Sequence, residues 1–246
     1  MPIRVVRRAS GLPALALVAA LGIVGCGAEP GKPASEPAPP GLASASPSAS
    51  APAGRPLTAA QLVAAALPVE ESPDAHGHPV SVREPRVSSR KSEPSDAACG
   101  RLLAAAGARQ TSGPAPAVAE QTFNWKGDIY GGNSTLASYG GSGAQEAFAQ
   151  VSEGLRTCRY YESQGPATTY KGTVTVDPAP RLGDEAVQFE VTAPSEMGPH
   201  VTQYTVVRTG SVVAMFTKLS IGGLDVRAFP PALIAQQISL LQQAQS

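Results

Sequence analysis

The chain has 246 residues, with 19 basic and 19 acidic side chains, 25 glycines and 24 prolines. Lysine and arginine do not cluster around aromatic residues, so the charge pattern gives no case for binding nucleic acid. The glycine-rich motifs that bind phosphate in P-loop and dinucleotide-binding proteins are absent, which excludes two large enzyme classes.

Residues 1–25 have the three parts of a secretory signal. The basic head contains Arg4, Arg7 and Arg8, and the apolar run is Leu12–Val24. The small residue Gly25 then stands directly before Cys26. The apolar run is shorter than the roughly 20 residues that a membrane-spanning helix needs, and Pro13 would disturb a long helix. We therefore expect residues 1–25 to be removed after export.

The four residues Ile23-Val24-Gly25-Cys26 resemble the lipobox of bacterial lipoproteins. That resemblance implies that Cys26 becomes the first residue and carries fatty acyl chains such as palmitate on its thiol. Two or three chains would hold the protein permanently on the outer side of the cell membrane, because a single chain binds reversibly. The alternative is an ordinary signal peptide followed by a chance cysteine.

Residues 26–56 are almost entirely proline, alanine, serine and glycine, with Leu42 as the single large aliphatic residue. Such a segment cannot bury enough apolar surface to offset its ordering entropy. It predicts a tether with an r.m.s. span of about 30 Å if flexible and a reach of about 90 Å in polyproline II. After loss of the signal, 16 basic and 19 acidic residues remain, for a charge near minus three.

Residues 57–246 suit one domain with a sizeable core. Cys99 and Cys158 are the other two cysteines, and in an exported domain an isolated pair is most simply a disulfide. A zinc site is the weaker alternative, because no histidine lies near them. A catalytic thiol is weaker still, because neither cysteine has a recognisable nucleophile context.

Four helices are expected. Thr58 with Gln61 has the spacing of a capping box, and so has Ser142 with Gln145, while Asp96 can cap a third helix that ends at Gly107. The expected helices are residues 58–67, residues 97–106, residues 142–158 with Phe148, Val151 and Leu155 on the apolar face, and a closing helix after Pro230 and Pro231 with Leu233, Ile234, Ile238 and Leu241 on one face.

Strands are expected wherever the apolar period changes to two. The expected strands are an edge strand at 80–83, a hairpin of 118–126 and 134–139, and strands at 170–176, 186–192, 201–208 and 211–220. Four consecutive strands with short turns predict an antiparallel meander. The predicted fold class is α+β, with a twisted antiparallel sheet, helices packed mainly on one side, and one disulfide.

Two sets of residues could carry hydrolytic or metal chemistry. Ser142 lies in Gly-Gly-Ser-Gly-Ala, close to the Gly-x-Ser-x-Gly elbow of serine hydrolases, and His200 is the only histidine downstream of it. A helix cap is the simpler role for Ser142. His76 and His78 could bind a metal with nearby acids, but solvated loop histidines are the better interpretation, and the acids are Glu70, Glu71 and Asp74.

Asp184 and Glu185 are adjacent carboxylates, but neighbours in sequence rarely face each other across a substrate, so Asp184 is read as a turn residue. The aromatic residues with a polar group are pocket candidates, of which one or two are expected to line a site. They are Trp125, Tyr130, Tyr139, Tyr160, Tyr161 and Tyr204.

The order of these features resembles the extracellular sensor-type domains of some actinobacterial receptor Ser/Thr kinases and of stand-alone lipoproteins. The motifs that carry the resemblance are the two cysteines, Leu182-Gly183-Asp184-Glu185-Ala186, and the Arg208-Thr209-Gly210 turn. The family implies a twisted antiparallel sheet, flanking helices, a ligand cleft and no catalysis. This chain departs from the kinase version in having no kinase domain, no retained membrane span and one cysteine pair where the family has two. We therefore do not expect it to signal across a membrane alone.

The leading hypothesis is thus a non-catalytic lipoprotein, lipid-anchored on the extracytoplasmic face of the membrane, that needs no cofactor. Its partner would be an apolar small molecule or an envelope protein, in the role of sensor accessory or carrier. The alternatives are a cell-envelope serine hydrolase that uses Ser142 and a structural adaptor that binds another envelope protein.

Overall fold

The computed structural model describes residues 55–68, 75–83, 96–106, 117–164, 169–222 and 228–246, and every structural statement below concerns these residues. Residues 1–54 lie outside the described part, so the predicted signal, Cys26 and most of the tether are not part of it. The same holds for Glu70, Glu71, Asp74 and Gly107.

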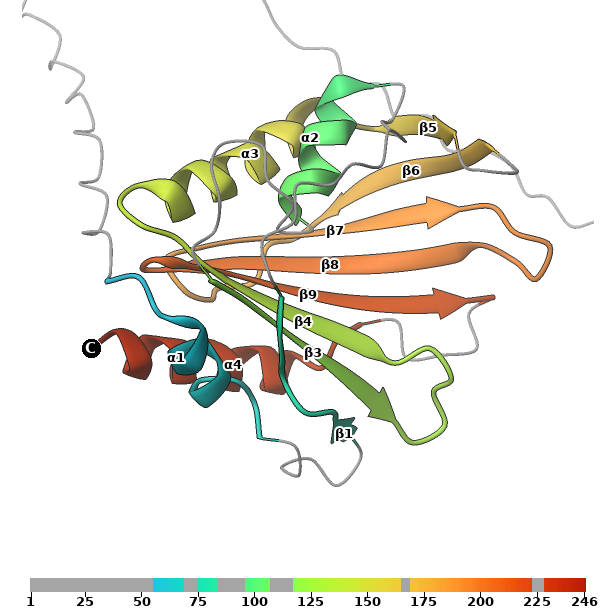
Figure 1. Cartoon of the computed structure of the whole chain (residues 1–246). Helices are drawn as coiled ribbons and strands as arrows, with labels where there is room; N and C mark the ends of the chain where they lie inside the picture. Colours follow the sequence, from blue (N-terminus) through green and yellow to red (C-terminus); the bar gives the residue numbers. More distant parts are fainter. Residues whose placement is uncertain (1–54, 69–74, 84–95, 107–116, 165–168, 223–227) are drawn as a thin grey trace, which may run out of the picture. The chain divides into compact units, whose positions relative to one another are not determined.

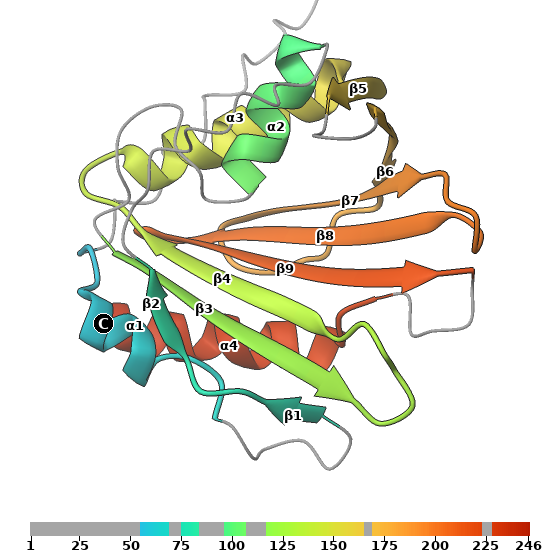
Figure 2. The same cartoon turned by 45° about the vertical axis from the view of Figure 1, so that its right-hand side comes forward.

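A single open antiparallel sheet organises the described residues (Figure 1). Its strands are β1 Ala75–Gly77, β2 Ser81–Arg83, β3 Ala117–Trp125, β4 Gly132–Ser138, β5 Tyr160–Gln164, β6 Thr169–Asp177, β7 Glu185–Ala193, β8 His200–Thr209 and β9 Val212–Ile221. The spatial order is β1-β3-β4-β9-β8-β7-β6-β5, and β2 also pairs with β3. Figure 2 shows the short β1 and β2 along β3 at one edge, while β5 forms the other edge.

The predicted meander and hairpin are both confirmed. Strands β6 to β9 pair in sequence order, and β8 turns into β9 through Gly210, whose φ of 54° suits glycine in a tight turn. Strands β3 and β4 pair from Ala117 with Ser138 to Phe123 with Gly132. Two strands, β1 and β5, were not predicted.

The four helices of the described part are α1 Ala59–Ala64, α2 Ala97–Ala106, α3 Gly143–Thr157 and α4 Pro231–Gln245. Two predicted caps are confirmed: Thr58 and Gln61 form a reciprocal capping box, and the Asp96 carboxylate accepts a hydrogen bond from the Cys99 N–H at 2.9 Å. The predicted capping box of Ser142 with Gln145 is wrong. The Ser142 hydroxyl instead donates to the Glu146 carboxylate and caps no backbone N–H.

The helices cover both faces of the sheet, which differs from the predicted one-sided packing. Along β9, Val212, Ala214 and Phe216 belong to the core with α1 and α4. Val213 and Met215 belong to the core with α2 and α3. Because successive strand residues point to opposite faces, this alternation places a helical layer on each side (Figure 1). The α+β class, the antiparallel sheet and the disulfide are confirmed.

Buried glutamines connect the layer of α1 and α4. The Gln237 side chain is fully buried, accepts from the Leu67 N–H at 3.0 Å and donates to the Ala65 carbonyl at 2.6 Å. From β3, the Gln121 amide donates to the Leu67 carbonyl at 2.8 Å. These bonds give hydrogen-bond partners to the backbone N–H and carbonyl groups that follow α1. They also fix α1 against α4 and the sheet.

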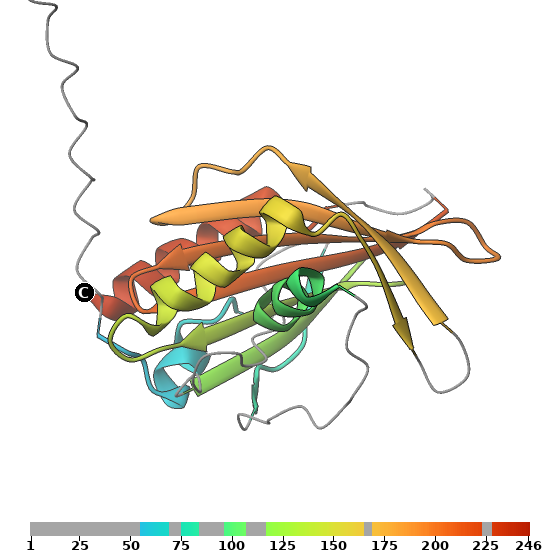
Figure 3. The same cartoon turned by 90° about the horizontal axis from the view of Figure 1, so that it is seen from above.

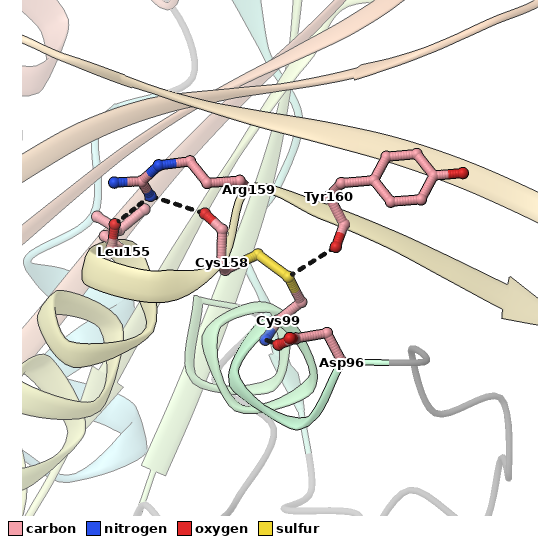
Figure 4. Close-up of a disulfide and its surroundings, with 6 residues drawn as sticks. All are labelled: Asp96, Cys99, Leu155, Cys158, Arg159 and Tyr160. Carbon is pink, nitrogen blue, oxygen red and sulfur yellow. Dashed lines mark hydrogen bonds between the residues drawn. A yellow bond between two sulfur atoms is a disulfide. The ribbon is translucent and has the colours of Figure 1, made fainter.

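A disulfide connects the layer of α2 and α3, which lies nearest the viewer in Figure 3. Cys99 and Cys158 join the first turn of α2 to the end of α3, and both are fully buried (Figure 4). Beside them, a Cβ at Gly154 would lie 2.7 Å from the Leu102 Cβ, so only glycine permits this helix spacing. Arg159 caps α3 by donating to the Leu155 and Cys158 carbonyls at 2.7 and 2.8 Å.

Candidate functional site

The sheet has two distinct ends. At the first, which we call the terminal end, the described chain begins and α4 finishes (Figure 1, left). The Leu57 N–H donates to the Ser138 hydroxyl at 2.7 Å, and the Ser211 hydroxyl lies 2.8 Å from the Arg55 carbonyl oxygen. The Gln245 side chain accepts from the Ser211 N–H at 2.8 Å. The first described residues are thus held against the β8–β9 turn.

At the opposite end, which we call the loop end, the described residues form two hairpin loops (Figure 1, right). They are residues 126–131, between β3 and β4, and residues 194–199, between β7 and β8. Antiparallel pairing brings both loops to the end of β9. The loop end is therefore remote from the point where the N-terminal segment joins the domain.

A buried ion pair shapes the β3–β4 loop. Asp128 accepts from the N–H groups of Tyr130 and Gly131 at 2.9 and 3.2 Å through one carboxylate oxygen. Its other oxygen lies 2.6 Å from the Lys218 Nζ on β9, and the two side chains are 1% and 0% exposed. A fully desolvated pair is costly to separate, because either charge left alone would lack both water and a counterion.

Trp125 covers this ion pair. The Lys218 Nζ lies 5.8 Å from the centre of the Trp125 ring, and its ammonium also donates to the Leu219 carbonyl at 2.6 Å. A Cβ at Gly132 would lie 2.6 Å from the same ring, so the glycine makes room for the indole. Phe229 packs edge-on against the ring with centroids 5.3 Å apart. The predicted pocket candidate Trp125 is thus a cover over a charged pair inside the core.

The β7–β8 loop is also fixed by local contacts. The Ser195 hydroxyl donates to the Gly198 carbonyl at 2.6 Å, and the Gly198 N–H donates back to the Ser195 carbonyl at 3.2 Å. The Gly222 N–H, just after β9, donates to the Pro199 carbonyl at 3.3 Å. Both hairpin loops of the loop end therefore have a defined shape.

The adjacent carboxylates of the β6–β7 connection meet a buried arginine at the terminal end. Arg208 Nη1 lies 2.8 Å from Asp184 and Nε lies 2.5 Å from Glu185. Asp184 also accepts from the Gly210 N–H at 2.7 Å. Two of the three motifs that carry the family resemblance, residues 182–186 and the turn at 208–210, are therefore in contact. Both carboxylates are engaged by one guanidinium, which gives this cluster a structural role and supports the interpretation of Asp184 as a turn residue.

The structure does not bring Ser142 and His200 together. Ser142 follows Tyr139, whose N–H donates to the Ser211 carbonyl at the terminal end. His200 begins β8 at the loop end, and the ten residues of that strand span roughly 30 Å. A base at that distance cannot activate the serine.

The two loop histidines do not assemble a metal site with other described residues. His78 Nε2 lies 2.7 Å from the Asn124 amide nitrogen, and His76 is an exposed residue of β1. Within the described ranges, no three side chains among histidine, cysteine, aspartate and glutamate come close enough to hold a metal ion.

The tyrosines divide by burial. Burial raises the pKa of Tyr139 and Tyr161, and Tyr204 stacks on Phe189 with ring centres 4.7 Å apart. Tyr160 is exposed and donates to the Glu162 carboxylate at 2.7 Å, a hydrogen bond that raises the tyrosine pKa. None of these side chains lies in a hairpin loop of the loop end; Tyr130 does, and it is half-buried.

Sequence reasoning missed the ion pair of Asp128 and Lys218. A lysine inside the mostly apolar strand β9 is a signal that could have prompted a search for an acid, because a lysine is almost never fully buried unless paired. The partner itself could not be found from the sequence, since the two residues meet only through the pairing of β4 with β9.

No family model matches the chain, and no curated protein is similar to it. Among solved structures, the chain is similar to an uncharacterised protein from Mycobacterium smegmatis, described as an Rv0999 ortholog. The two share 13% identity over 70% of this chain and 88% of that chain, with a TM-score of 0.37.

None of the helices in the described part is long and apolar enough to cross a membrane.

Proposed function

We propose that the protein is a lipid-anchored extracytoplasmic lipoprotein whose α+β domain binds a ligand or an envelope partner and catalyses no reaction. The lipobox-like residues before Cys26 support the anchor. The disulfide of Cys99 and Cys158 suits a domain that folds in an oxidising compartment. The resemblance to sensor-type domains favours a role as sensor accessory or carrier.

One observation carries the proposal: the described chain begins at the terminal end, and the shaped loops lie at the opposite end. A tether that leaves from Arg55 would place the loop end on the side of the domain away from its attachment point. Loops carried on a rigid sheet are the usual place for binding residues. This arrangement suits a module that presents a surface from a membrane.

The anchor is tested by metabolic labelling with an alkynyl fatty acid in bacteria that express the full chain. We expect label on the wild-type protein and none on Cys26→Ser, which should leave the membrane fraction. Leu42→Ser, a change inside the tether, is the matched control and should keep both label and location. Equal labelling of wild type and Cys26→Ser would refute lipidation at this residue.

The binding role is tested by native mass spectrometry of the mature chain released from a mild detergent. A reproducible apolar adduct would support a carrier of a small molecule. Esterase assays of wild type and Ser142→Ala test the absence of catalysis. We expect neither protein to turn over an ester substrate, whereas turnover that depends on Ser142 would contradict the proposal.

A further inference from the structure

We propose that the loop end is a docking surface for a protein partner, with Ile129 and Met197 as its two apolar anchors. The inference builds on the proposed function, because it names the surface and the kind of partner of the anchored module. It rests on the exposure, spacing, fixation and charge of the two hairpin loops.

The two anchors are among the most exposed large apolar side chains of the described residues. Ile129 is 80% exposed and Met197 is 69% exposed. Their loops leave the sheet three strand spacings apart, about 14 Å across the strands, and the register offsets them by three residues of β9, about 10 Å along the strands. That separation fits within one protein interface of ordinary size.

Each anchor stands on a loop that is fixed before binding. The Asp128 carboxylate, held by Lys218, also holds the N–H groups that follow Ile129. The hydrogen bonds between Ser195 and Gly198 enclose Met197 in a closed turn. A partner that docks here orders little additional chain, which lowers the entropic cost of association.

The charges beside the anchors favour a protein over a lipid surface. Exposed Lys126 lies in the loop of Ile129, and exposed Glu196 directly precedes Met197. An anionic membrane would attract cations at both loops and repel the glutamate. A protein with two apolar depressions, an acidic group opposite Lys126 and a basic group opposite Glu196 would complement both loops.

The point at which the chain enters the described part agrees with this surface. The Ser211 hydroxyl donates to the Arg55 carbonyl at 2.8 Å at the terminal end. The chain therefore enters the described part at the end of the sheet opposite the two anchors.

The experiment places a photo-crosslinking phenylalanine analogue at single positions of the full chain in the bacterium that encodes it. The test positions are Ile129 and Met197. The control positions are Val82 on β2 and Val176 on β6, which are 52% and 48% exposed and lie outside both loops. We expect one protein adduct of the same mass from both test positions and none from the controls.

A second variant makes the result specific. Ile129→Asp, with the crosslinker at Met197, should reduce the adduct at least 10-fold without changing the melting temperature, because the side chain at 129 touches solvent. Similar adducts from all four positions, no adduct from either test position, or adducts with lipid alone would each overturn the proposal.

The test separates this inference from the anchor. Suppose that Cys26→Ser leaves the membrane and that both test positions lose their adduct in this variant but keep it in the wild-type chain. The anchor is then needed for the protein to meet its partner, and the docking surface is retained. If the wild-type chain is not lipidated and yet gives the predicted adducts, the anchor fails and the docking surface is retained.

Discussion

A buried cation at each end of the sheet holds a connection between two strands, but the two cations differ in how far water reaches the carboxylates that they bind. Lys218 on β9 holds the β3–β4 loop through Asp128, and both side chains are shielded from water. Arg208 on β8 holds the β6–β7 connection through Asp184 and Glu185, whose side chains are 29% and 48% exposed.

The difference lies in what remains when the cation is removed. At the terminal end, water can solvate the carboxylates that lose Arg208. At the loop end, the Asp128 carboxylate would stay inside the core without a counterion. The loop end therefore depends on its ion pair far more strongly than the terminal end does.

Lys218→Met should have the largest effect, a loss of about 4 kcal/mol in the free energy of unfolding, measured by urea denaturation. The double variant Lys218→Met with Asp128→Asn should recover most of this loss. Asparagine keeps an oxygen for the N–H groups of Tyr130 and Gly131 and carries no charge. A double variant as unstable as the single one would show that packing, and not charge, sets the cost.

Arg208→Met should lower the free energy of unfolding by about 2 kcal/mol, because it removes charge-assisted hydrogen bonds from carboxylates that water can reach. Part of the difference from wild type should disappear in 1 M salt, since partly exposed ion pairs are screened. Arg208→Lys is the control: it keeps the charge and loses the two-pronged geometry, so its loss should be intermediate. A loss as large as that of Lys218→Met would remove the contrast between the two ends.

Gln245→Ala should lower the free energy of unfolding by about 1 kcal/mol, because it frees the Ser211 N–H and the Thr209 carbonyl at the β8–β9 turn. Gln242→Ala, an exposed position of the same helix, should change nothing measurable. Crosslinking at Ile129 should be the same in both variants. A change there would mean that the two ends are coupled.

The smallest effect should come from the exposed pair of Glu162 and Lys171, which joins edge strand β5 to β6 and lies in neither hairpin loop. The Lys171 ammonium, 2.9 Å away, lowers the pKa of Glu162, and Glu162 raises the pKa of Lys171. The carboxylate contribution is therefore present above the ordinary glutamate pKa and is lost as pH falls through the lowered value. The slight difference in melting temperature between wild type and Glu162→Gln at pH 7 should shrink as the pH falls below the ordinary glutamate pKa and vanish in acid, where the carboxyl is protonated. A difference that persists there would contradict this assignment.

The strands that were predicted are those in which side-chain period and turn chemistry agree, as in the meander that ends at Thr209-Gly210. Strand β5 was missed because Tyr160–Gln164 has no apolar alternation and becomes a strand through its pairing with β6. The two-sided helix packing had a visible signal. The run Val212-Val213-Ala214-Met215-Phe216 is apolar at odd and at even positions, which indicates a strand buried on both faces of the sheet.

The site was less predictable than the fold. Cys99 and Cys158 could be paired because no other cysteine follows the signal and Cys26. The contact between Asp128 and Lys218 depends on strand register between segments 90 residues apart, which local patterns do not encode. Ser142 stands at the position where the local pattern predicts a helix cap, but its hydroxyl donates to the Glu146 carboxylate and does not accept from a backbone N–H.

The contacts between Gln237 and the residues that follow α1 join two segments that emerge at different times during synthesis. Gln237 binds backbone groups of Leu67 and Ala65, which are 170 and 172 residues earlier in the chain. A chain that emerges from its N-terminus first, from a ribosome or an export pore, presents α1 long before α4 exists outside. The layer of α2 and α3 draws on residues up to Met215, so all of its segments are present before α4, and the contact between α4 and α1 can form only after that.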